Sequence, residues 1–306
     1  MVRDLRQLAG CMRRMASSVS CRIGHGLAWR WGDAKYSMRL GWAQLRIRSP
    51  FMPKGRPHTL RGPLIVSLTS YPPRYSTLAL TLRSLLRQTV KADRTILWIA
   101  HADFELLPRE VFDLQSRGLE IRRTDDTKSY KKIIPALDAF PAAFICTADD
   151  DLYYWPTWLE ELVDGADESG RIVPCHRAHE IAFDSDGIVK PYRDWVLDVA
   201  RRGESGHYFP TGVGGILYPP GILNHEAGDR EFALTLCPFN DDIWLFWMGR
   251  RNGARYKTVG RHRAFVLWRG SQDQSLWEEN RKGRNDVQIW NMIERYGYPD
   301  CSIVSV

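Results

Sequence analysis

Four short strand-like segments, among them the nearly continuous apolar run 64–69, alternate with segments of helical periodicity between residues 64 and 147. Such runs are typical of parallel strands that are buried on both faces. The alternation predicts an α/β fold, an open, mostly parallel twisted sheet with flanking helices, whose ligands bind beyond the carboxyl ends of the strands. Strands are expected at 64–69, 94–100, 119–123 and 143–147, and helices at 78–86, 108–117 and 129–140.

The second half of the chain is less regular. A glycine-rich turn and strand are expected over 211–218 and a strand over 171–174, with helices near 156–166, 241–250 and 286–296. Residues 49–63 are rich in proline and are expected to be a linker. The predicted domain organisation is an arm and linker over residues 1–62 and one domain over 63–306, with halves at 63–155 and 156–306.

The positive charge of the chain is concentrated in the N-terminal arm. Thirteen Lys and Arg against two Asp give residues 1–62 a net charge of +11, so residues 63–306 carry −4 of the total of +7. This distribution does not favour a nucleic-acid partner, which would need a basic folded face. Residues 1–48 combine apolar and arginine residues, which fits either helices on an anionic membrane surface or an arm that packs on the body or on a partner.

The six cysteines, Cys11, Cys21, Cys146, Cys175, Cys237 and Cys301, include no C-x-x-C pair. They are interpreted as reduced thiols of a cytoplasmic protein, with peripheral contact at the inner face of the membrane through the arm. No apolar run reaches 18 residues, so no transmembrane helix is expected. The first 30 residues also lack the apolar stretch of a secretory signal.

Three consecutive carboxylates, Asp149, Asp150 and Asp151, follow the fourth expected strand. Adjacent carboxylates repel one another, so a run at a sheet edge favours a divalent cation, and Mn²⁺ or Mg²⁺ suits oxygen ligands and the phosphates of a nucleotide. If the segment continues as a strand, Asp149 and Asp151 point to one side and Asp150 to the other. The alternative is an acidic turn that caps the helix beginning near Pro156.

This segment resembles the D-x-D motif of GT-A-type glycosyltransferases, especially the family-two-like enzymes of polysaccharide synthesis. The resemblance covers residues 63–250 and implies a GT-A-like, Rossmann-related fold, in which the first strand and turn bind the nucleotide of a nucleotide-sugar donor. It also implies a metal bound by Asp151 and Asp149, with Asp149 and Asp150 on the donor. His262 resembles the additional metal ligand of some members, although a lone histidine is more often structural.

The resemblance also assigns donor and acceptor residues. On the donor side it implies that the turn at 69–74 contacts the nucleotide. It also implies that an acid and a lysine after the third strand contact the donor. The alternative is that the turn is an ordinary strand-to-helix connection and that the lysines are solvated. On the acceptor side it implies a glycine-rich segment, for which a structural turn is the alternative. The donor residues are Thr69, Tyr71, Arg74, Asp126 and Lys131, and the acceptor residues are Gly214, Gly215 and Trp244.

Asp241 and Asp242 open an apolar helix directly after Asn240. Acids in the first turn of a helix stabilise its dipole without any chemistry. The segment nevertheless resembles the acidic motif of inverting transferases, in which a general base deprotonates the acceptor hydroxyl. Asp242 is the candidate base, and Asp241 is the second choice.

The sequence therefore predicts a metal-dependent glycosyltransferase that moves a sugar from a nucleoside-diphosphate sugar to the hydroxyl of a glycan or other acceptor. Inversion at the anomeric carbon and a role in surface glycan or polysaccharide synthesis are expected. One alternative is a sugar-phosphate nucleotidyltransferase, although such enzymes usually carry a glycine-rich basic loop after the first strand, and residues 69–74 contain no glycine. A non-catalytic carbohydrate-binding protein on the same fold is the other.

Overall fold

The computed structural model describes residues 34–49, 55–271 and 283–298. By its internal contacts the chain divides into two units, Met1–Arg48 and Ser49–Val306. Most of the expected basic arm, residues 1–33, and the cysteines Cys11, Cys21 and Cys301 lie outside the described residues. Cys146, Cys175 and Cys237 are buried free thiols.

In the first unit, residues 34–48 form a helix. Leu40, Ala43 and Ile47 on this helix are buried, whereas Met38 and Trp42 are exposed. Among the described residues, none of the helices combines the length and the apolarity that crossing a membrane requires.

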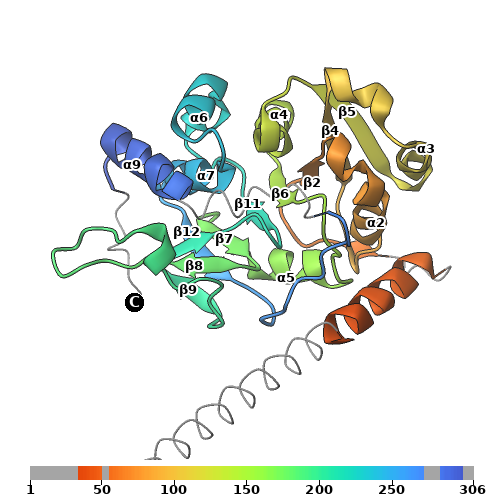
Figure 1. The fold of residues 1–306 in the computed structure, drawn as a ribbon, viewed down its shortest axis with the longest axis horizontal. Helices are drawn as coiled ribbons and strands as arrows, with labels where there is room; N and C mark the ends of the chain where they lie inside the picture. The colour runs from red at the N-terminus through yellow and green to blue at the C-terminus, as the bar shows by residue number, and fades with distance from the viewer. Residues whose placement is uncertain (1–33, 50–54, 272–282, 299–306) are drawn as a thin grey trace, which may run out of the picture. The chain divides into compact units, whose positions relative to one another are not determined.

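The second unit is built on an eight-stranded sheet (Figure 1), counted over the residues that the structure describes. Four of its strands are the expected ones, and they pair in parallel in the order β5-β4-β2-β6. The sheet continues β11-β7-β12-β9, where β11 runs antiparallel to both neighbours and β12 runs parallel to β7. The strands are β2 (Leu64–Thr69), β4 (Arg94–Ala100), β5 (Leu119–Thr124), β6 (Phe144–Ala148), β7 (Ile172–Cys175), β9 (Gly203–Ser205), β11 (Ile216–Tyr218) and β12 (Arg255–Thr258).

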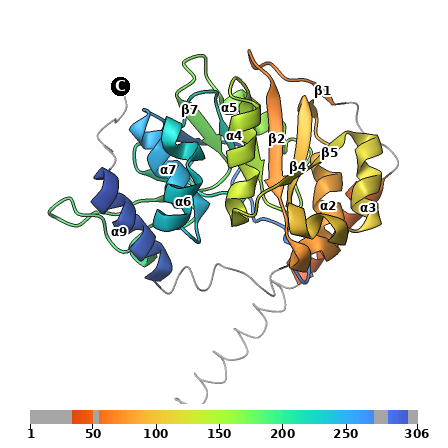
Figure 2. The ribbon, with the colours of Figure 1, turned by 90° about the horizontal axis from the view of Figure 1, so that it is seen from above.

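Helices cover both faces of this sheet because the side chains of each strand alternate between them. Leu64, Val66 and Leu68 of β2 pack in one apolar core with α2, α3 and α5, and Ile65 packs in the other with α4, α6, α7 and α9. Both views show α6, α7 and α9 side by side (Figures 1 and 2). The helices are α2 (Tyr75–Leu85), α3 (Arg109–Phe112), α4 (Ile134–Ala139), α5 (Trp158–Gly165), α6 (Arg230–Leu236), α7 (Asp241–Arg251) and α9 (Asn285–Tyr296).

The α/β fold and the mostly parallel sheet are therefore confirmed. Two short pairings complete the described strands, β1 (Arg56–Pro57) with β3 (Val90–Lys91) in parallel, and β8 (Ala178–Glu180) with β10 (Tyr208–Pro210) antiparallel. The first of these pairings lies within the expected linker, residues 49–63. Residues 56–57 are held to the body by strand pairing, so the part of the chain directly before β2 belongs to the second unit.

Candidate active site

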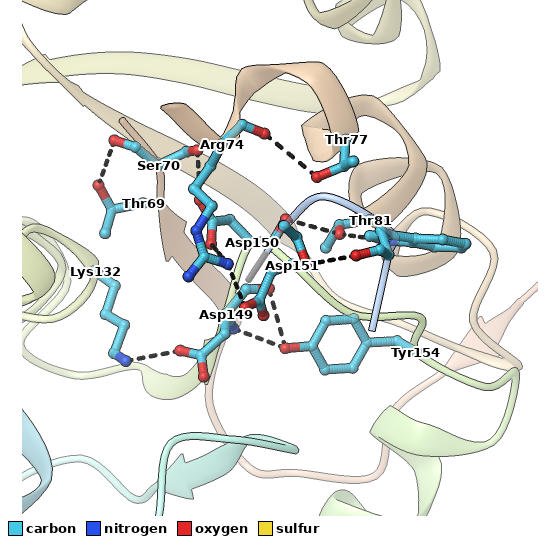
Figure 3. A network of polar contacts seen from close by, with 12 residues as sticks. Thr69, Ser70, Arg74, Thr77, Thr81, Lys132, Asp149, Asp150, Asp151 and Tyr154 are labelled. Carbon is cyan, nitrogen blue, oxygen red and sulfur yellow. Dashed lines mark hydrogen bonds and ion pairs between the residues drawn. The ribbon is translucent and has the colours of Figure 1, made fainter. Parts of the chain in front are cut away.

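The aspartate run, defined as Asp149–Asp151, follows β6 at the carboxyl edge of the parallel strands, and each of its side chains has its own partner (Figure 3). Asp149 Oδ1 lies 2.9 Å from the ammonium of Lys132. Asp150 Oδ2 accepts a hydrogen bond of 2.5 Å from the Ser70 hydroxyl, just after β2. Asp151 forms an ion pair with Arg74, at the start of α2. The aspartate run thus contacts three different segments of the chain, through Lys132, Ser70 and Arg74.

The expected alternation of the three side chains is wrong. β6 ends at Ala148, so the strand geometry that would pair Asp149 with Asp151 stops before the run begins. Asp150 and Asp151 both lie near Arg74, at 4.0 Å in the case of Asp150. Asp149 turns instead toward Lys132. The division is therefore between Asp149 and the other two.

Lys132 connects the aspartate run to the acids that open α7. Its side chain is only 7% exposed, and its Nζ lies 2.9 Å from Asp149 Oδ1 and 3.1 Å from Asp241 Oδ2. Burial alone would lower the pKa of this ammonium, but Asp149, Asp241 and Asp242 together hold it well above its usual value. Lys132 is therefore charged, and it is a counter-ion shared by two segments far apart in the sequence.

Gly212 marks the point at which these groups converge. A methyl group added at Gly212 would lie 3.0 Å from Asp242 Oδ1, 3.1 Å from Lys132 Nζ and 3.7 Å from Asp149 Oδ1. The Gly212 N–H donates a hydrogen bond of 2.9 Å to Asp242 Oδ2. The structure thus brings together the expected metal ligand Asp149 and the expected base Asp242. Asp242, Lys132, Asp149 and Gly212, with Asp241, are called the Gly212 cluster below.

Asp242 is the accessible acid of the pair in this cluster. Asp241 is buried at 6% exposure, whereas Asp242 is partly exposed. Both belong to the first turn of α7, where the Asn240 side chain caps the helix by accepting from the Asp242 N–H. Desolvation, followed by the charge of Asp241, raises the pKa of Asp242 to about 7, although Lys132 and the Gly212 N–H oppose the rise. Such a carboxyl group exchanges its proton near neutral pH.

The nucleotide-side residues have internal partners in this structure. The Thr69 hydroxyl donates to the Trp98 carbonyl oxygen at 2.7 Å, and Tyr71 is partly buried. Arg74 is directed at the aspartate run, where Asp151 and Asp150 hold its pKa above its usual value against the effect of burial. Of the three expected nucleotide contacts, the structure joins Arg74 to the acidic site.

The lysine that reaches the acidic site is Lys132, and the sequence favoured its neighbour Lys131. Lys131 instead forms an ion pair of 2.5 Å with Asp126, whose side chain is 63% exposed. The two lysines lie in the 3₁₀ helix η4 (Lys128–Lys132), directly before the buried Ile133 and α4. Both side chains are buried, at 4% and 7% exposure, so they differ in the acid that each ammonium contacts and not in burial.

The acceptor-side glycines have a packing role. Gly214 and Gly215 adopt the left-handed backbone conformation, with φ of +96° and +95°. A Cβ on Gly214 would lie 2.5 Å from the Phe265 ring, and a Cβ on Gly215 would lie 2.6 Å from the Trp158 indole. Both the backbone conformation and the close ring contacts therefore require glycine. Acceptor contact by these two residues stays a prediction.

The expectation that Trp244 contacts the acceptor is corrected by its burial. Trp244 has no exposed surface, and its indole N–H donates to the Ala227 carbonyl oxygen at 3.1 Å. It belongs to the apolar core on one face of the sheet. α7 is buried around most of its circumference, so an aromatic residue in its first turn faces the core and not a ligand.

The expected metal ligands Asp149, Asp151 and His262 do not form a metal site in this arrangement. His262 lies 3.3 Å from Asp198 and pairs with that residue. Over residues 34–49, 55–271 and 283–298, no three His, Cys, Asp or Glu side chains are placed to hold a metal ion together. Lys132 and Arg74 occupy the two carboxylates that a divalent cation would need. Asp149 and Asp151 would have to leave Lys132 and Arg74 before they could bind Mn²⁺ or Mg²⁺, so metal binding by these residues stays a prediction.

Sequence comparison finds no matching protein-family model and no matching curated protein. Solved structures do match. A mannosyltransferase from Pyrobaculum calidifontis in complex with GDP-Man and Mn²⁺ is 13% identical, with a TM-score of 0.47, over 87% of this chain and 73% of that chain. Glucosyl-3-phosphoglycerate synthase from Mycobacterium tuberculosis, in complex with Mn²⁺, UDP and glucosyl-3-phosphoglycerate, is 14% identical, with a TM-score of 0.42, over 80% and 84%.

A third match is 4-diphosphocytidyl-2C-methyl-D-erythritol synthase from Anaerococcus prevotii, 13% identical, with a TM-score of 0.42, over 75% of this chain and 96% of that chain. The chain is thus similar, at a distance, to GT-A-type glycosyltransferases and to related nucleotidyltransferases. Because these TM-scores lie below 0.5, the choice between the two activities depends on the chain's own residues.

Proposed function

We propose that this chain is a glycosyltransferase that moves a sugar from a nucleoside-diphosphate sugar to an acceptor hydroxyl, with Asp242 as the general base. The observation that carries the proposal is the Gly212 cluster. In this cluster the partly exposed Asp242 lies around Gly212 together with Lys132 and Asp149, at the carboxyl edge of the parallel strands. Ligands of open α/β sheets bind at this edge.

The reaction requires a base for the acceptor hydroxyl and cations for the leaving diphosphate. Asp242 takes the proton of the acceptor hydroxyl as its oxygen attacks the anomeric carbon, and a base with a pKa of about 7 suits this transfer at neutral pH. The bond from the anomeric carbon to the diphosphate oxygen breaks, and the nucleoside diphosphate leaves with the electron pair. Arg74 and Lys132 are the cations positioned to stabilise the charge that develops on it. Attack opposite the leaving group inverts the anomeric carbon.

The sequence also predicts that the enzyme requires Mn²⁺ or Mg²⁺. Five carboxylates surround the two cations Arg74 and Lys132, and this excess of negative charge favours a further cation. Asp149 and Asp151 would first have to release Lys132 and Arg74. The roles of Asp242, Arg74 and Lys132 do not depend on a metal, and assays with and without Mn²⁺ measure whether one is required.

The test combines donor binding with product analysis. The full chain is incubated with UDP-, GDP- and dTDP-sugars, each with and without Mn²⁺. A rise in Tm with one of these donors, together with release of its nucleoside diphosphate, is the expected result. Release of pyrophosphate from a nucleoside triphosphate and a sugar 1-phosphate would instead establish nucleotidyl transfer. If none of these nucleotides raises the Tm, a non-catalytic protein is the better account. The acceptor and a role in surface glycan synthesis stay predictions.

A further inference from the structure

The helix over residues 34–48 carries two apolar stripes that differ in exposure. Leu40, Ala43 and Ile47 are 6%, 0% and 2% exposed. The second stripe consists of Met38, Trp42 and Leu45, which are 71%, 52% and 70% exposed. At about 100° per residue the two stripes lie on nearly opposite sides of the helix. The second, called the exposed stripe here, leaves three large apolar side chains in water.

Basic residues border the exposed stripe on both sides. At helical spacing Lys35, Arg39 and Arg46 follow one flank, and Arg48 lies on the other. All four are exposed. Residues 34–48 contain no Asp or Glu, so this segment carries a charge of +4. The Arg46 guanidinium lies 4.3 Å from the centre of the Trp42 ring, which places a cation directly beside the apolar surface.

We propose that this helix lies in the plane of an anionic phospholipid membrane, with the exposed stripe in the acyl boundary and the cations on the lipid phosphates. An apolar strip flanked by cations fits such a surface, and Trp is favoured at the membrane–water interface. A second copy of the helix would bring a further +4 against this one, and like charges oppose that pairing. A nucleic acid would leave the apolar stripe in water.

Co-sedimentation of the full chain with vesicles tests the proposal. The vesicles are phosphatidylcholine alone and phosphatidylcholine mixed with phosphatidylglycerol. The wild type is expected to bind the mixed vesicles, with weaker binding in high salt. Changing the stripe with Met38→Ser, Trp42→Ser and Leu45→Ser is expected to weaken binding about tenfold or more, because three apolar contacts are lost. Lys35→Gln with Arg39→Gln is expected to remove the preference for phosphatidylglycerol.

The matched control is Ile188→Ser with Val196→Ser, because these side chains of the second unit are also exposed, at 61% and 56%. The control is expected to bind vesicles as the wild type does, and thermal unfolding of each variant checks that it is folded. The proposal is overturned if the stripe variant sediments like the wild type, since another part of the chain would then hold the membrane. It is also overturned if the wild type binds no vesicles. A wild type that is dimeric without vesicles, and that the stripe variant makes monomeric without any change in vesicle binding, would overturn it as well.

Discussion

The two acidic segments of the site, Asp149–Asp151 and Asp241–Asp242, are made of the same residue but are neutralised differently. Each side chain of the aspartate run has its own cation or hydroxyl. The pair that opens α7 shares Lys132 with Asp149, and Asp242 accepts a hydrogen bond from the Gly212 N–H. Burial and the neighbouring charge of Asp241 raise the pKa of Asp242 to about 7, although Lys132 opposes the rise. Both segments contain one carboxyl group with a raised pKa, because burial and the charge of Asp151 also raise the pKa of Asp150 to about 7. The two groups differ in their hydrogen-bond partners, which are the Ser70 hydroxyl for Asp150 and the Gly212 N–H for Asp242.

The largest effect is expected for Asp242→Asn, which removes the proton acceptor and keeps the shape. Release of nucleoside diphosphate should fall by about 10²–10⁴-fold, the usual contribution of a general base. The assay compares this variant with Asp186→Asn, a change at an exposed aspartate on the 184–187 turn. Full transfer by Asp242→Asn would remove Asp242 from the role of base.

Lys132→Met and Lys131→Met separate the shared counter-ion from an ordinary ion pair. Without Lys132, buried carboxylates lose their cation, so the free energy of unfolding should fall by about 3–5 kcal/mol. Lys131 is as buried as Lys132, at 4% exposure, but Lys131→Met leaves only Asp126, which is 63% exposed and stays hydrated, so the loss should be at most about 1 kcal/mol. Urea unfolding of both variants measures this difference. Equal losses would mean that Lys132 is not a special counter-ion.

Two glycine substitutions distinguish packing from chemistry in the segment between the acidic regions. Gly215→Ala strains a left-handed backbone and pushes into Trp158, so we expect a loss of about 1–3 kcal/mol of stability. Gly212→Ala instead presses on Asp242 and Lys132, so donor turnover should fall about tenfold with a smaller change in stability. Thermal unfolding and product release on both variants check this. The opposite pattern would place the chemistry at Gly215.

The smallest effect is a pH dependence of stability. The folded pKa of Asp242, about 7, lies above the ordinary value of 3.8, so the folded state binds the proton more tightly. This group therefore lowers the stability as the pH rises from about 4 to about 7, and the cost is fully present above about 7. Asp242→Asn should be more stable than the wild type at pH 8, by roughly 1–3 kcal/mol, and the difference should shrink at pH 5. A constant difference across this range would contradict the pKa.

β2 and β4 were predictable from the sequence because each is a largely apolar run, and both begin and end where they were expected. β5 was expected as well, although three of its six residues are charged. A strand was expected within 211–218, but the antiparallel place of β11 between β6 and β7 was not, because a strand of three residues carries no periodicity that indicates its direction. The placement of β1 was also missed, since a pairing of two residues depends on contacts distant in the sequence.

Within the site, Asp149, Asp241 and Asp242 could be named from the sequence because each lies in an acidic run directly beside an apolar strand or helix. The choice between Lys131 and Lys132 could not be made, because one residue of rotation in a 3₁₀ helix decides which of two buried ammonium groups reaches the acidic site. The partner of His262 could not be read either, since Asp198 lies in an irregular segment. Sequence patterns indicate which side chains could take part in catalysis, and the tertiary structure determines which of them contact one another.

The most direct test of the proposed base is the pH dependence of nucleoside-diphosphate release by the wild type and by Asp241→Asn, at saturating donor. The wild type should gain activity as the pH rises through an apparent pKa near 7. Asp241→Asn removes the charge that helps to raise the pKa of Asp242, so its activity should rise at lower pH. A wild-type profile without this inflection, or one that Asp241→Asn leaves in place, would contradict the assignment of Asp242 as the general base.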